Sequence, residues 1–226
     1  MGAFEEEIDK GLLGISSEKV CYFAWLCAVR ALPFMGARGN FNFWEEKEID
    51  RHLNSIFYVL DVAAAHATHA AHATHAAHAA YDAAHAATND DAHYAARAAA
   101  KAAYSDAADA ADAARAAADA NVSNMDITQI LESDLEAIKE GEPITNSGTK
   151  PYGDVWDNFQ KALKSVGCGY WGRLYESIFN DAFVIDPMAL KIRLGIPESI
   201  RQLGAAAVAR ELQKLEEQES TQTDQN

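Results

Sequence analysis

The sequence predicts an all-α fold, a helical bundle with long alanine-rich helices and a smaller aromatic-rich helical region toward the C-terminus. Three observations predict it. Alanine, the residue with the strongest helix propensity, dominates residues 62–120. No glycine or proline, which interrupt helices, occurs between Gly39 and Gly141. On both sides of the alanine block, large apolar residues recur three or four positions apart, the spacing of one helix face.

The N-terminal part predicts a lead-in over residues 1–15 followed by two amphipathic helices. Ser16 or Ser17 is expected to cap the first, which should run to about Leu32 and end because Pro33 disfavours helical geometry in the residue before it. Asn42, with Glu45 three residues later, has the spacing of a capping box and predicts the start of the second helix. The core face of that second helix is predicted to consist of Ile49, Leu53, Ile56, Phe57 and Leu60.

The alanine block is expected to form two helices separated by a turn. Residues 88–91 carry side chains that compete for backbone hydrogen bonds, so the turn is placed there. A single helix from the second amphipathic segment through residue 87 would be longer than a compact chain of this size, which predicts either an elongated molecule or a bend near Asp61. A further helix is predicted over residues 126–140 and a linker over residues 141–153.

The C-terminal region is predicted to contain two aromatic-rich helices, a helix starting at Asp186-Pro187, and a last helix opened by Pro197. We expect three parts: an alanine-rich helical domain over residues 1–140, a C-terminal helical region over 151–215 packed on it or appended to it, and a disordered tail over 216–226.

Charge and cysteine content limit the partners and the compartment. The formal net charge is −15, which disfavours nucleic acids and anionic membranes and favours a protein partner, ideally a basic one. The alanine-rich faces also offer a route to a homo-oligomer. The three cysteines form no CxxC pair, the N-terminus is acidic where a signal peptide would be basic, and the apolar run over residues 20–35 is too short to span a bilayer. These features predict a cytoplasmic protein.

A low-complexity, histidine-rich repeat lies inside the alanine block. Five histidines recur at a strict period of three over residues 66–78, so they wind round a helix and do not form one stripe. One set does share a face at helical spacing: His75, His78, Asp82 and His85. Imidazoles with a carboxylate suit Zn²⁺ or Ni²⁺, which makes divalent-metal binding an alternative function. Duplication of a short repeat explains the same pattern without any cofactor.

No catalytic motif emerges from the sequence. It contains no phosphate-binding glycine loop, no GxSxG and no HExxH, and a non-enzyme is therefore predicted. A second alternative is an enzyme with a site near Cys168, which lies between two glycines. A lone cysteine next to Tyr170 and Trp171 is, however, typical of a packed core residue.

The segment Trp25-Leu26-Cys27-Ala28-Val29-Arg30-Ala31-Leu32-Pro33, followed by a loop, an amphipathic helix and AAHAA and AARAA tracts, resembles the alanine-rich helical immunity proteins of bacterial polymorphic toxin systems. The resemblance covers about residues 18–118. It implies a toxin-binding bacterial protein without catalysis. The sequence accordingly predicts a non-catalytic protein that binds another protein. The resemblance narrows this prediction to an immunity role.

Overall fold

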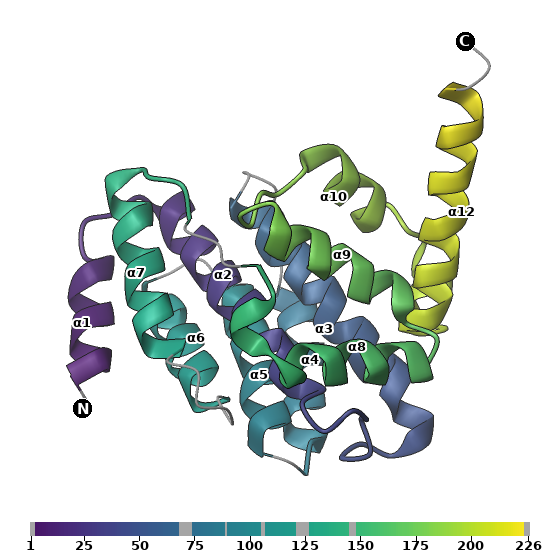
Figure 1. The fold of residues 1–226 in the computed structure, drawn as a ribbon, viewed down its shortest axis with the longest axis horizontal. Coiled ribbons are helices and arrows are strands. Elements are labelled where there is room, and N and C mark those ends of the chain that lie inside the picture. The colour runs from purple at the N-terminus through teal and green to yellow at the C-terminus, as the bar shows by residue number, and fades with distance from the viewer. Residues whose placement is uncertain are drawn as a thin grey trace.

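The computed structural model describes residues 3–67, 74–88, 90–104, 107–120, 127–144 and 148–223; within these ranges, side chains 3, 5, 66–67, 74–79, 107 and 219–223 lie outside the description. The described residues form twelve α-helices, one short 3₁₀ helix and no strand, which confirms the all-α fold (Figure 1). The elements are α1 (Ala3–Leu12), α2 (Ser17–Met35), α3 (Glu46–Ala67), α4 (Thr74–Ala86), α5 (Asp90–Ala102), α6 (Ala107–Asp119), α7 (Ile127–Glu140), η1 (Lys150–Tyr152), α8 (Asp154–Ser165), α9 (Gly169–Asn180), α10 (Pro187–Leu194), α11 (Glu198–Arg201) and α12 (Ala205–Thr223).

The alanine-rich helix α5 lies at the centre of the N-terminal part. It packs against α2, α3, α4 and α6, and methyl side chains allow these close approaches because little volume separates the backbones. Its alanines at positions 92, 95, 96, 98, 99, 100 and 102 are all buried. These alanines of α5 are therefore covered within the chain, and self-association through the alanine-rich faces stays a prediction.

Helix α2 begins where the sequence indicates but ends later. The Ser16 hydroxyl accepts a hydrogen bond from the Lys19 N–H at 3.4 Å, which confirms the predicted cap. Pro33 does not end the helix; it lies in the last turn, which continues to Met35. Proline removes only its own N–H, and at the end of a helix that loss is small. Termination occurs at Gly36, whose N–H reaches back to the Pro33 carbonyl.

Helix α3 begins at Glu46, not at Asn42. Here the Asn40 side chain accepts from the Asn42 N–H at 3.0 Å, and the Trp44 N–H donates to the Phe41 carbonyl, so these residues form a turn. The predicted core positions of α3 are all buried. The helix also continues past Asp61 to Ala67, so the predicted bend near Asp61 is absent, and α4 packs against α3.

The alanine block contains a break that was not predicted, because α5 ends at Ala102 and α6 begins at Ala107. Lys101 joins the two helices, with its Nζ 2.7 Å from Asp109 and 3.0 Å from Asp112. The predicted break between Ala86 and Asp90 and the predicted helix α7 are both present.

The C-terminal helices pack on the N-terminal ones: α8 contacts α2, whereas α10 and α12 contact α3. The Phe57 ring stacks on Trp171 with centroids 4.6 Å apart. The predicted cap at Asp186 is confirmed, because its carboxylate accepts from the N–H groups of Met188 and Ala189 at 2.8 and 3.3 Å.

The last predicted helix is instead two helices, α11 and α12, separated at Gly204. Gly204 has φ of +100°, and a Cβ there would collide with the Asp50 carboxylate. That carboxylate also accepts from the Ala206 N–H at 2.7 Å and so holds the start of α12. Residues 216–223, which we expected in a disordered tail, continue α12, and Figure 1 shows this helix leading away from the body. Its Glu, Gln and Lys residues are good helix formers, which accounts for the extension.

A search of the described residues finds no helix with the length and apolarity needed to cross a bilayer.

Candidate functional site

The predicted metal set is only partly within the described residues. The backbone of His75 and His78 belongs to α4, but their side chains lie outside the description. Asp82 and His85 are exposed on the same helix, and the His85 ring lies 6.0 Å from that of His93, a ring nitrogen of which is 2.9 Å from the Ala84 carbonyl oxygen. Among the side chains that the structure describes, no three His, Cys, Asp or Glu residues gather as a metal site.

Cys168 lies in the core beneath α9 and α12. It is fully buried, and its Sγ is 4.0 Å from the Asp50 carboxylate. Burial, together with the negative charge of Asp50, raises the pKa of the thiol to about 12. Since the thiolate is the nucleophilic form, this environment is the opposite of the one that activates a cysteine.

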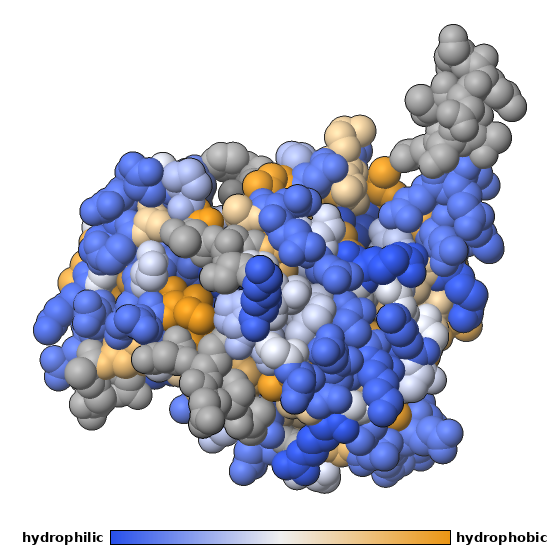
Figure 2. All heavy atoms as spheres, viewed as in Figure 1, coloured by the Kyte–Doolittle hydropathy of each residue, from blue (hydrophilic) through white to orange (hydrophobic). Residues whose placement is uncertain are grey.

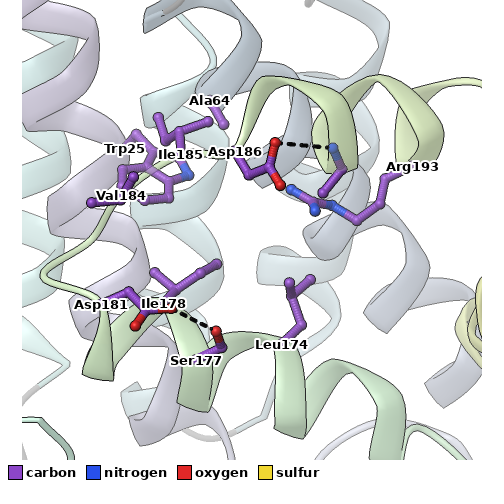
Figure 3. Close-up of a pocket in the computed structure, with 11 residues that line it drawn as sticks. Trp25, Ala64, Leu174, Ser177, Ile178, Asp181, Val184, Ile185, Asp186 and Arg193 are labelled. Carbon is purple, nitrogen blue, oxygen red and sulfur yellow. Dashed lines mark hydrogen bonds between the residues drawn. The ribbon is translucent and has the colours of Figure 1, made fainter. Parts of the chain in front are cut away.

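A cavity lies between α9 and α10 and has a volume of about 380 Å³. Helix α2 contributes Trp25 to its wall and α3 contributes Ala64, while α9, α10 and the loop between them supply the rest (Figure 3). The apolar part of the lining consists of Trp25, Ala64, Leu174, Ile178, Val184, Ile185 and Ala189. A mostly apolar cavity of this size with a few polar groups is typical of a binding site.

A buried ion pair lies at the inner end of the cavity. Arg193 lines the cavity and donates from Nε to Asp61 Oδ1 at 2.7 Å, and both side chains are less than a tenth exposed. Burial raises the pKa of the Asp61 carboxyl, and the positive charge of Arg193 opposes that effect. Asp61 Oδ2 is buried without a hydrogen-bond partner among the described residues, and no described acceptor holds the Arg193 Nη groups. At the cavity, the Arg193 guanidinium therefore has N–H donors that no described acceptor engages.

The mouth of the cavity is acidic and apolar. Asp181 and Asp186 line it and are exposed. Close to them in the chain, Val184 and Met188 leave 65% and 67% of their surface exposed, so two of the exposed large apolar side chains among the described residues lie here. On the face drawn in Figure 2, apolar atoms reach the surface near the α9–α10 loop and α10 among hydrophilic neighbours.

The loop that forms this mouth has an uncommon backbone. Ala182 and Phe183 adopt φ of +54° and +59°, a left-handed geometry that bulky residues rarely take. The Phe183 ring is fully buried under the Arg30 guanidinium, 4.4 Å away, and its carbonyl accepts from the Tyr22 hydroxyl at 3.1 Å. These contacts hold the loop against α2 and turn Val184 toward solvent.

Sequence reasoning missed this site. It placed Asp186 only at the start of a helix. Nothing in the pattern pairs Asp61 with Arg193, which lie 132 residues apart. The one available signal was Arg193 itself, a charged residue among the apolar positions of a short helix.

Comparison with protein-family models, with curated proteins and with solved structures finds no match to this chain.

Proposed function

We propose that the protein is a non-catalytic bacterial binding protein of the cytoplasm that docks a basic protein partner on the face formed by the α9–α10 loop and α10. One observation carries the proposal: the exposed apolar side chain of Val184 lines the mouth of a cavity together with the exposed carboxylates of Asp181 and Asp186, and Met188, which is also exposed, follows two residues after Asp186. Apolar groups that remain exposed next to a polar rim are typical of interaction surfaces.

Charge determines which partner this face suits. Asp181 and Asp186 are both acidic, and the whole chain carries a formal net charge of −15. A basic protein would be attracted over a distance and would meet carboxylates at the contact, whereas an acidic one would be repelled. In the narrower form suggested by the resemblance of residues 18–118 to immunity proteins, the partner is a toxin that this protein neutralises.

Crosslinking in the native host tests the proposal. A photo-crosslinking amino acid is placed at Met188, and a control is placed at Leu13, which is 75% exposed on the other side of the molecule. We expect position 188, and not position 13, to capture a specific protein with a basic surface. That protein is then purified and its affinity measured against Val184→Asp and Met188→Asp, with Leu13→Asp as the matched control.

Each aspartate on the docking face should weaken binding about tenfold or more, because burial of one apolar side chain contributes about 1.5–3 kcal/mol. Rising salt should weaken binding further. Three outcomes would contradict the proposal. They are equal capture at both positions, capture of an acidic protein, and an affinity that Val184→Asp and Met188→Asp leave unchanged.

A further inference from the structure

We infer that the cavity between α9 and α10 binds an apolar group that carries a cation at its outer end. This inference deepens the proposed function, because it assigns the chemistry of the group that enters the site. Its source is either a side chain of the partner followed by a basic residue or a free organic amine.

The inner end of the cavity admits an apolar group and excludes a cation. Trp25 and Ala64 are almost fully buried there, and the wall between them and the mouth is formed by Leu174, Ile178 and Ile185. Arg193 also lines the cavity, its side chain is 8% exposed, and Figure 3 shows its guanidinium extending from α10 toward the side on which Asp186 lies. A ligand cation placed this deep would lose its water and meet a like charge.

The outer end favours a cation. The Ser177 hydroxyl fixes Asp181 by donating to Oδ2 at 2.9 Å, and two backbone N–H groups fix Asp186 through Oδ1. Each carboxylate is therefore held in place at the mouth. Two fixed negative charges above an apolar wall select a ligand whose cation stays at the mouth while its apolar part enters.

The space exists because two lining positions carry only a methyl group. Ala64 lies on α3 and Ala189 on α10, and both face the cavity. A larger side chain at Ala189 would occupy the volume without removing any charge. This position is half-buried, so a change there is tolerated more readily than one in the core.

Titration with three small probes tests the inference. Phenethylammonium has the inferred chemistry, 3-phenylpropionate has the same ring with an anion, and 2-phenylethanol has it without charge. Indole N–H signals of the four tryptophans report the position, and the Trp25 signal is assigned from Trp25→Phe. We expect phenethylammonium to shift the Trp25 signal selectively, with a dissociation constant on the order of 1 mM, and to bind more tightly than either other probe.

Variants separate the two ends of the cavity. Asp181→Asn with Asp186→Asn should weaken phenethylammonium about fivefold and leave 2-phenylethanol unchanged, since asparagine preserves the cap and the Ser177 contact but not the charge. Ala189→Phe should abolish binding of both, whereas Ala137→Phe, at a half-buried position on α7, should not. Tighter binding of the anion, or shifts that Ala189→Phe leaves intact, would overturn the inference.

The outcomes also distinguish this inference from the docking proposal. A partner whose affinity responds to Met188→Asp but not to Ala189→Phe would support docking and refute a partner side chain as the occupant of the cavity. Selective binding of phenethylammonium without any captured partner would support the cavity inference with a free amine as the source, and the docking proposal would fail.

Discussion

Two buried ion pairs join segments that are far apart in the chain. Arg30 on α2 holds Asp134 on α7 through two hydrogen bonds of 2.5 and 2.8 Å, and Arg193 on α10 holds Asp61 on α3 through one. All four side chains are less than a tenth exposed. Sequence analysis used Arg30 only as a break in an apolar run and Asp61 only as a candidate bend, since neither partner can be found without the fold.

Replacement of Arg30 by methionine should lower the free energy of unfolding by about 3–5 kcal/mol, because Asp134 would remain buried without its counter-ion. The double variant Arg30→Met, Asp134→Leu should lose clearly less than the sum of the single changes. Lys214→Met, which breaks the exposed pair with Glu211, should cost no more than about 1 kcal/mol and is the control. Urea unfolding measures Arg30→Met, Asp134→Leu, the double variant and Lys214→Met; additive losses would show that the pair is not coupled.

His52 should make stability depend on pH. Its ring is 5.1 Å from that of Trp44 and is buried, and burial, followed by the charge of Arg51, lowers its pKa from 6.5, while Glu48 and Asp82 act in the opposite direction. Folded His52 therefore binds a proton less readily than unfolded His52. The contribution of His52 to folding stability is complete above its ordinary pKa and is lost as the pH falls through its lowered pKa in the folded protein.

Between pH 7 and pH 5, the thermal midpoint of His52→Gln should consequently fall less than that of the natural chain. Differential scanning calorimetry at several pH values measures this difference, and the comparison removes the contribution of the remaining histidines. Parallel curves for the two chains would mean that His52 has the same pKa folded and unfolded.

At the scale of elements, the sequence correctly predicted those helix starts that depend only on neighbouring residues. Ser16 and Asp186 cap helices as expected, because a cap needs only a side-chain oxygen near the first N–H groups. The predicted end of α2 at Pro33 was wrong, and so was the prediction of a single last helix. Gly204 interrupts that helix because Asp50, on α3, occupies the space that a side chain would need, and a contact across the fold cannot be read from neighbouring residues.

In the alanine-rich helices, side-chain volume should determine which substitutions the fold accepts. Ala99 is fully buried on α5, which packs against α2, α4 and α6, whereas Ala108 on α6 is exposed. Ala99→Leu should destabilise the protein by about 1–3 kcal/mol, since the added methylenes have no free space. Ala108→Leu should change stability by less than about 0.5 kcal/mol. Equal losses in urea unfolding would mean that helix propensity, and not close packing, selects alanine in this block.

At the scale of the whole molecule, both halves of the chain contribute to one hydrophobic cluster. Phe57 packs on Trp171 and Tyr175, and α8 covers α2. The sequence shows the difference in composition between residues 1–140 and 151–215, but composition does not reveal whether two regions share a core. The proposed docking face depends on that shared core, because its cavity takes wall residues from α2, α3, α9 and α10.

We therefore expect a single cooperative unfolding transition. Circular dichroism, dominated by the many helices, and tryptophan fluorescence, to which Trp25 and Trp44 in the N-terminal part and Trp156 and Trp171 in the C-terminal part contribute, should give the same urea midpoint. A chain ending at Ile144 should not unfold cooperatively, because Phe57 would lose its aromatic partners and Asp61 its only described counter-ion, Arg193. Separate midpoints, or a cooperative transition in the shortened chain, would instead mean that residues 1–140 fold alone and that the cavity lies at a boundary between two domains.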